Sequence, residues 1–452
     1  MPSKPSISRQ AIIIIHGIGE QRPMDTLRDF ATSVAPENQD PNKPAFFSKP
    51  DQFSDSYELR RLTANRQRKS YKTDYFELYW AHLMLDTKIS DVLWWTWNVF
   101  VRFPGQVPKR LRWIYYLFWA IVLATISCLI FIQNFGSSLI PVWWKNVITV
   151  GWFKAVSSFI VTLASILING LLLNYLGDAV RYFAPRPGNI AQRQQIRGTG
   201  ISLLRRLHEQ KDAIGNNLYD RVVIVGHSLG SIIAYDILSL YWNEISPKLQ
   251  VDPLAIDEAE QAVANFNSTK INLEQFRSAQ FKFWLSQYKN SDSWRVSDIL
   301  TVGSPLAFAH FHIARNVDEF SLKKRQREFP TCPPVMERPT AAALKKLKNA
   351  NKKDWFSFPA TDDPAVPRNL HHAAVFAMTR WTNMYFGNDF VGGEIACLGS
   401  GVENKKLRSA RYGWFPFISH THYWDKKEKE SLRYLVEKLQ LIFHFDDQEI
   451  EA

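Results

Sequence analysis

The chain contains 452 residues, of which 46% are apolar, and it carries 30 Phe, 16 Trp and 16 Tyr with a formal net charge of +12. This length and aromatic content exclude a mainly disordered protein and suffice for a large buried core. Basic residues concentrate in segments 60–72, 323–327 and 345–353 without any recognised nucleic-acid motif, so we expect solvated surface or contact with anionic lipid head groups, and no nucleic-acid partner.

The first residues show no sign of a cleaved export signal, because residues 1–10 are polar and the apolar run 11–15 is too short for one. The three cysteines stand far apart in the sequence: Cys128, Cys332 and Cys397. Their spacing matches neither a Cys-x-x-Cys pair nor a zinc motif. We therefore expect a reducing compartment and no metal.

Short apolar segments alternate with helix-like ones outside the middle of the chain. The strands expected are 11–15, 75–79, 221–225, 298–302 and 375–379, and the helices expected are 193–210, 231–242 and 426–443. Such alternation predicts an α/β fold, with a mainly parallel sheet and helices on both faces. Segment 243–294 is polar and helical in character, as a cap-like excursion over the sheet would be.

Two long uncharged segments, 113–132 and 155–176, interrupt this pattern. Each could cross a hydrocarbon core of about 30 Å as a helix that rises about 1.5 Å per residue. Together they predict a two-helix transmembrane hairpin, with 133–154 as a short loop on the far side. The alternative is a pair of buried helices, but soluble helices seldom lack a charge on every face.

The hairpin divides the chain into 1–91, a membrane-associated insertion 92–177 and the remainder 178–452. Segment 92–103 is rich in tryptophan but too short to span, so it could lie in the membrane interface or pack in a core. Basic residues crowd the two outer ends of the hairpin: Arg102, Lys109, Arg110, Arg112, Arg181, Arg186, Arg193 and Arg197. The positive-inside rule therefore predicts an integral membrane protein in which both termini and the α/β parts, 1–91 and 178–452, are cytoplasmic.

The most informative segment is 219–236. A β-branched run at 222–225 leads into Gly226-His227-Ser228-Leu229-Gly230, and a helix-like segment follows. A G-x-S-x-G motif between a strand and a helix is typical of a nucleophile elbow, in which small residues allow a sharp turn that exposes the serine hydroxyl. The alternative is an ordinary strand-to-helix turn. The correct flanks on both sides favour Ser228 as a nucleophile.

Two places could supply N–H donors to an oxyanion. The N–H of Leu229 would lie in the first turn of the helix after Ser228, where exposed amides favour negative charge. A second donor is expected at Gly17 or Ile18, because His16-Gly17 directly follows the apolar run 11–15. The alternative for this pair is a simple glycine turn.

Three segments carry a resemblance to a known family: 16–19 (HGIG), 226–230 (GHSLG) and 301–306 (TVGSPL). Over 11–79 and 177–443 the chain resembles lipases and esterases of the α/β-hydrolase superfamily, from whose soluble members the hairpin departs. The resemblance implies the α/β-hydrolase fold and a triad in the order Ser, Asp, His, with the acid in D-x-V and the base in H-x-x-Y.

Both patterns occur in the implied order, so the resemblance points to Asp389 and His420 as partners of Ser228. Asp389 follows the strand-like segment 381–386, and His420 precedes the last expected helix. The rivals are His422 for the base, and Asp362, Asp363 and Asp425 for the acid; His310, His312, His371 and His372 fit the order less well.

This set predicts acyl transfer without a metal or a dissociable cofactor. Ser228 would attack an ester carbonyl after giving its proton to His420, and Asp389 would orient the imidazolium. Because the hairpin lies between Gly17 and Ser228 in the sequence, we expect a lipid bilayer as partner and a lipid or other acylated substrate. A thioesterase or acyltransferase with the same triad, and a catalytically silent membrane scaffold of the same fold, are the alternatives.

Overall fold

A computed structural model describes residues 9–18, 22–35, 44–54, 56–64, 72–84, 187–287, 294–312, 316–341, 354–361, 365–410 and 419–441, several short stretches between 101 and 127, and single positions at 182, 314 and 363. The chain forms two compact units, Met1–Leu83 with Gln192–Ala452, and Met84–Ala191. The first unit is discontinuous in sequence and contains all the described strands.

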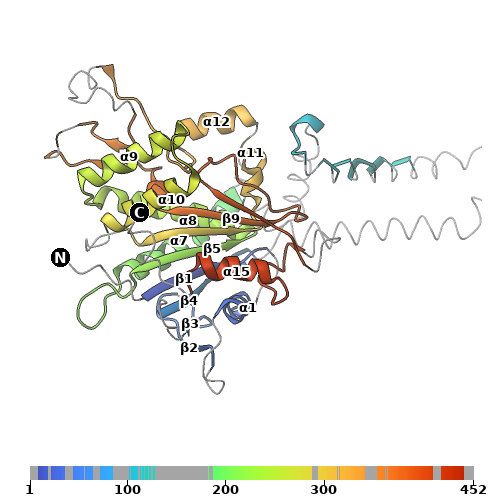
Figure 1. Cartoon of the computed structure of the whole chain (residues 1–452). Coiled ribbons are helices and arrows are strands. Elements are labelled where there is room, and N and C mark those ends of the chain that lie inside the picture. The colour runs from blue at the N-terminus through green and yellow to red at the C-terminus, as the bar shows by residue number, and fades with distance from the viewer. Residues whose placement is uncertain are drawn as a thin grey trace, which may run out of the picture. The chain divides into compact units, whose positions relative to one another are not determined.

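The first unit is built on a sheet of eight strands in the order β10-β9-β6-β5-β1-β4-β3-β2 (Figure 1). Its strands are β1 (Arg9–Ile15), β2 (Phe46–Pro50), β3 (Arg60–Ala64), β4 (Lys72–Leu78), β5 (Arg221–His227), β6 (Val296–Val302), β9 (Arg380–Phe386) and β10 (Glu403–Leu407); β7 (Ser357–Phe358) and β8 (Asn369–Leu370) form a separate ribbon. Neighbours from β10 to β4 pair in parallel, whereas β3 and β2 pair antiparallel at one edge. The predicted α/β fold with a mainly parallel sheet is confirmed.

Helices cover both faces of this sheet. They are α1 (Asp25–Val34), α7 (Pro187–Glu209), α8 (Leu229–Ile245), α9 (Pro253–Asn267), α10 (Leu273–Ser286), α11 (Ala309–His312), α12 (Val317–Arg325) and α15 (Lys429–Lys438). α1 and α15 share one buried cluster with Ile12 and Ile14 of β1. Side chains alternate along a strand, so Ile13 points to the other face, where α8 packs against β1, β5 and β6.

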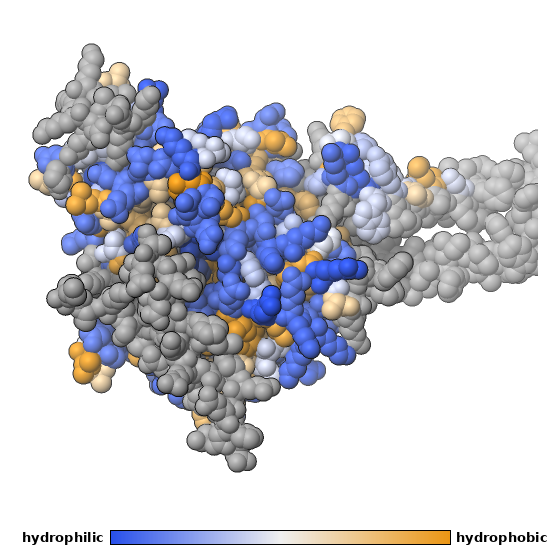
Figure 2. All heavy atoms as spheres, in the orientation of Figure 1, coloured by the Kyte–Doolittle hydropathy of each residue, from blue (hydrophilic) through white to orange (hydrophobic). Residues whose placement is uncertain are grey.

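Because helices cover both faces of the sheet, its central strands are buried. Every residue of β5, β6 and β9 is buried, as expected for parallel strands with helices on both faces. By contrast, the surface of the described residues in Figure 2 is mainly hydrophilic on the side shown, with scattered apolar residues. Apolar side chains therefore fill the space between sheet and helices.

Most predicted elements of this unit are present, with one error. Segment 243–294 does contain helices, α9 and α10, and α10 begins with a capping box at Asn272. The predicted strand 375–379 is wrong, because Val375–Ala377 forms a 3-10 turn and β9 begins at Arg380. A short apolar run does not distinguish a strand from a buried turn, and the strand formed instead in the aromatic segment that follows.

The predicted transmembrane spans fall mainly outside the described residues. Segment 155–176 lies outside them entirely, as does the loop 133–154, and only scattered positions of 113–132 are described. Of the helices that the structure describes, none has the length and hydropathy needed to cross a bilayer. The hairpin stays a prediction.

The position of β1 opens a crevice at the carboxyl ends of the strands, which form the carboxyl edge of the sheet. Ile15 pairs with Leu78 of β4 on one side and with Gly226 of β5 on the other, which aligns the carboxyl ends of the three strands. The chain runs from β1 toward β4 and returns to β5 across β1. Where the strand order reverses in this way, an open α/β sheet leaves a crevice outside its carboxyl ends, and ligands bind there.

Candidate active site

Ser228 lies at this edge, in the turn between β5 and α8. Its backbone has φ 52° and ψ −127°, a conformation that costs a residue with a side chain about 1–3 kcal/mol. The flanking glycines allow the chain to pass so closely: a Cβ on Gly226 would lie 2.5 Å from Cα of Ser231, and one on Gly230 would lie 2.2 Å from the carbonyl oxygen of Ile15. The turn therefore has the form of a nucleophile elbow.

The hydroxyl of Ser228 belongs to a chain of hydrogen bonds. Nε2 of His420 lies 2.8 Å from Oγ of Ser228, and Nδ1 of His420 lies 2.8 Å from Oδ2 of Asp389. Asp389 is fully buried, and Ser228 and His420 are 3% and 8% exposed. A serine hydroxyl, an imidazole and a buried carboxylate in this order are the components of nucleophilic acyl transfer.

Asp389 is held in the loop after β9. Its Oδ1 accepts hydrogen bonds from the N–H groups of Val391 and Gly392 at 2.8 and 3.1 Å, and its Oδ2 also accepts from the hydroxyl of Tyr423 at 2.6 Å. Burial raises the pKa of Asp389, but its interaction with His420 and the hydrogen bonds from His420, Tyr423 and Gly392 hold the pKa below its ordinary value. The carboxyl is therefore ionised at neutral pH and able to stabilise an imidazolium.

The segment after β6 connects the acid to the elbow. Gly303 has φ 58°, and a Cβ there would lie 2.8 Å from the ring of Tyr423 and 3.1 Å from Oδ2 of Asp389. The next hydroxyl, of Ser304, lies 2.6 Å from that of Ser231, which donates to the carbonyl oxygen of Ser228 at 2.5 Å. This G-S-P segment therefore contacts both ends of the site.

The loop after β1 lies against Ser228. A Cβ on Gly17 would lie 2.9 Å from Cβ of Ser228. His16 fixes this loop: its ring stacks on Trp80, and its Nε2 and its carbonyl oxygen accept from the backbone and indole N–H groups of Trp80 at 3.2 and 3.0 Å. Nδ1 then donates to the carbonyl oxygen of Gly17 at 2.8 Å, and burial lowers the pKa of His16 to about 4.

The predicted oxyanion donors are placed in different ways. Leu229 is the first residue of α8, so its N–H has no acceptor within the helix and lies beside Ser228. Gly17 is close to Ser228, and Ile18 follows it as a half-buried residue. Leu229 and Gly17 are thus brought to Ser228 from two separate elements.

The rivals of the assigned residues lie in other surroundings. His422 is half-buried and its ring bonds to the hydroxyl of Thr421, and Asp425 accepts from the N–H of Lys427. Asp363 accepts from the N–H of Ala365, whereas Asp362 is outside the described residues. His371 contacts the carbonyl oxygen of Val335, His372 that of Arg327, and His310 the ring of Phe320; the side chain of His312 is not described. Only His420 and Asp389, of these described candidates, contact the serine or its base.

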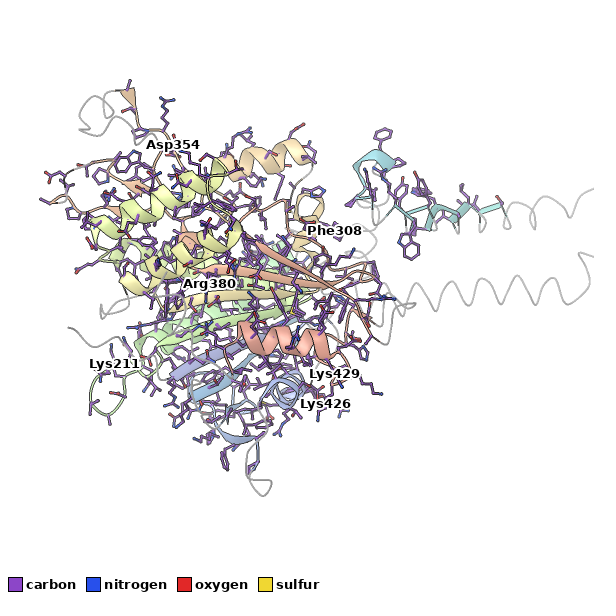
Figure 3. The ribbon with its side chains drawn as sticks, viewed as in Figure 1. Lys211, Phe308, Asp354, Arg380, Lys426 and Lys429 are labelled. Atoms are coloured by element: carbon purple, nitrogen blue, oxygen red, sulfur yellow. The ribbon has the colours of Figure 1, made fainter. Side chains whose placement is uncertain are left out.

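Figure 3 shows at which end of the strands the labelled side chains of the first unit lie. Phe308 and Lys426, from the segments that follow β6 and His420, lie toward the right of the view, at the carboxyl edge of the sheet. Lys211, which precedes β5, lies toward the left. The candidate site is therefore assembled at the carboxyl ends of the strands, from segments after β1, β5, β6, β9 and β10.

Two side chains at this edge received no role from the sequence. Tyr423 bonds the acid, and its place in the H-x-x-Y pattern is a signal that sequence inspection could have used. Glu77, at the end of β4, is buried and accepts from the N–H of Met24 at 2.7 Å. Burial raises the pKa of Glu77 to about 7, and no sequence pattern distinguishes it.

Comparisons of the chain with protein-family models, with curated proteins and with solved structures found no match. The function of the chain must therefore be inferred from the site itself.

Proposed function

We propose that the chain is a membrane-anchored serine hydrolase of the α/β-hydrolase type, similar to lipases and esterases, which cleaves an ester bond of a lipid or other acylated substrate. The observation that supports this most is the chain of hydrogen bonds from Ser228 through His420 to Asp389, at 2.8 Å in each step. The strained backbone of Ser228, at the switch point of a mainly parallel sheet, supports it further.

Each residue then has one task. Nε2 of His420 takes the proton of the Ser228 hydroxyl as Oγ bonds to the ester carbonyl carbon, and Asp389 stabilises the imidazolium that forms. The N–H groups of Leu229 and of Gly17 or Ile18 stabilise the oxyanion. Collapse of this intermediate transfers the proton from His420 to the departing alcohol. A water molecule, deprotonated by His420, then releases the acid and regenerates Ser228.

Membrane anchorage rests on the two uncharged segments 113–132 and 155–176. In the described part of the first segment, Trp113, Tyr116 and Leu123 are 49%, 55% and 60% exposed. Exposed apolar side chains in such a segment favour contact with lipid. An anchor of this kind would keep the hydrolase beside a lipid substrate.

Covalent labelling by a fluorophosphonate tests the chemistry. Oγ of Ser228 should displace fluoride from phosphorus, so the wild-type protein should be labelled with one equivalent and Ser228→Ala should not be labelled. Ser239→Ala is the matched control, because Ser239 lies in α8 and only bonds to the carbonyl oxygen of Tyr235. An unlabelled wild-type protein, or a Ser228→Ala variant labelled as strongly as wild type, would refute the serine hydrolase.

Substrate and membrane association need separate measurements. Fatty acyl oxyesters and thioesters in mixed micelles should be compared, and faster turnover of thioesters would replace the esterase by a thioesterase.

The protein should stay in the membrane fraction after carbonate and high-salt washes, because salt does not screen buried apolar surface. Single cysteines at Ser3 and Ser138 should be labelled from opposite sides of the membrane, with Ser3 on the cytoplasmic side; labelling of both from one side would exclude the hairpin.

A further inference from the structure

His227 is the last residue of β5 and directly precedes Ser228. It is 9% exposed, and its ring centroid lies 5.1 Å from that of His420 and 5.0 Å from that of Trp424. The nucleophile and this histidine therefore occupy adjacent positions on the backbone, but the imidazole packs against the segment that carries the base.

A hydrogen bond joins the two segments directly. Nε2 of His227 lies 2.8 Å from the backbone carbonyl oxygen of His420. A carbonyl oxygen only accepts, so Nε2 of His227 must carry a proton and donate it. The bond connects positions that are 193 residues apart in the chain. It fixes the backbone of the base without using either ring nitrogen of His420.

The other side of the same ring faces the oxyanion loop. A Cβ on Gly17 would lie 3.2 Å from Nδ1 of His227. The imidazole of His227 thus fills the space between Gly17 and the carbonyl group of His420. One rigid ring borders the segment that supplies a predicted oxyanion donor and the segment that supplies the base.

The ring is suited to this position because it stays neutral. Burial, followed by its interaction with His420, lowers the pKa of His227 to about 3. A second cation beside His420 would oppose formation of the imidazolium. A neutral ring with a proton on Nε2 can hold the base in place without that penalty.

We infer that His227 is a positioning residue, which sets the distance between the base His420 and the oxyanion loop at Gly17 by donating a hydrogen bond to the backbone of His420. The inference rests on the proposed serine hydrolase. It predicts that loss of the donor slows the chemical step of molecules that are still folded, because a displacement of about 1 Å in a catalytic group can reduce a rate by about a hundredfold.

The test compares two substitutions of His227 in the full-length protein. His227→Gln keeps an N–H donor at a similar reach, whereas His227→Leu has a comparable volume and no donor. For each variant, the maximal rate of fluorophosphonate labelling (kinact), its half-saturation concentration (KI) and the final stoichiometry of label are measured. Stoichiometry reports the folded fraction, and kinact reports the geometry of the base and nucleophile.

A buried histidine away from the site provides the control. His208 is 8% exposed, its Nδ1 bonds to the carbonyl oxygen of Leu204 at 2.8 Å, and its Nε2 accepts from the N–H of Arg295 at 3.1 Å. Burial lowers its pKa to about 3, as for His227. His208→Leu should lower the unfolding midpoint and leave kinact unchanged.

We expect His227→Leu to lower kinact by about 30-fold or more with little change in KI or in the final stoichiometry, and His227→Gln to restore kinact to within about fivefold of wild type. Equal kinact values for His227→Leu and wild type would overturn the inference and leave the serine hydrolase intact. A reduced stoichiometry with normal kinact would show a structural role only, which also overturns it. If the fluorophosphonate did not label the wild-type protein at Ser228, the proposed function would be overturned and this inference with it.

Discussion

The hydroxyl of Tyr423 offers a quantitative test of how the acid is held. It donates to Oδ2 of Asp389 at 2.6 Å and accepts from the N–H of Phe386 at 3.0 Å. Tyr423→Phe keeps the ring, which stacks on Phe386, and removes these two bonds. A hydrogen bond to a charged group contributes about 1.5–3 kcal/mol, and a buried N–H left unpaired costs about 1–3 kcal/mol. We expect the free energy of unfolding to fall by about 3 kcal/mol.

The same substitution should change the pH dependence of labelling. The hydrogen bond from Tyr423 is one of the interactions that lower the pKa of Asp389, so its loss makes the carboxylate bind a proton more readily. The acid limb of kinact should therefore move to higher pH.

Denaturant titration and labelling between pH 4 and 9 would measure both effects. Tyr434→Phe is the matched control, because the hydroxyl of Tyr434 donates to Glu403 at 2.8 Å, and Glu403 is no part of the triad. This variant should lose some stability and keep the wild-type acid limb. If Tyr423→Phe lost stability with an unchanged acid limb, the hydroxyl would have only a structural role and would not lower the pKa of Asp389.

Three further predictions concern the elements that support the site. Gly230→Ala should lower the free energy of unfolding by about 3 kcal/mol or more, because its Cβ would meet a carbonyl oxygen of β1 at 2.2 Å. The control is Gly198→Ala in α7, whose Cβ would meet nothing within 4 Å and which should raise the free energy of unfolding by about 1 kcal/mol. Equal effects of the two variants in denaturant titrations would contradict the close packing at Gly230. Glu77 in the folded protein keeps its proton up to about pH 7, whereas its ordinary pKa is 4.5, so stability should fall as the pH rises through this window, by up to about 3 kcal/mol. Glu77→Gln should remove that slope in unfolding measurements, and a slope equal to wild type would exclude Glu77 as its source. His420→Ala should abolish labelling and His422→Ala should leave most of it, and the reverse order would transfer the role of base to His422.

The elbow is the part of the site that local sequence predicts best. The strand, the turn and the helix around Ser228 are contiguous, and each of Gly226 and Gly230 is needed because another backbone passes within the space of a side chain. Such requirements act over a few residues, so a motif and its flanks contain the relevant information. The same holds for the strand β1 and the His16-Gly17 pair after it.

The prediction of Asp389 and His420 as partners of Ser228 depended instead on the resemblance to lipases and esterases. Asp389 and His420 lie in loops, and the bond from His420 to Ser228 spans 192 residues. Only the H-x-x-Y pattern that the resemblance implies separates His420 from His422, two residues away. The structure distinguishes them because the turn between 419 and 425 directs the ring of His420 to Ser228 and that of His422 to Thr421. The contact of His227 with His420 could not be predicted from local sequence either, since it exists only after β5 and the loop that carries His420 meet.

The central place of β1 has a consequence for biosynthesis. Gln10 to Ile15 pair with Arg221 to Gly226, yet about 200 residues separate the two strands in the chain, which take about 10–40 s to translate at 5–20 residues per second. During this interval the apolar run of β1 has an unpaired edge on a ribosome-bound chain, a condition that invites aggregation. We therefore expect the nascent chain to depend on a holdase chaperone until β5 emerges, and to gain the proposed activity only after His420 has been synthesised.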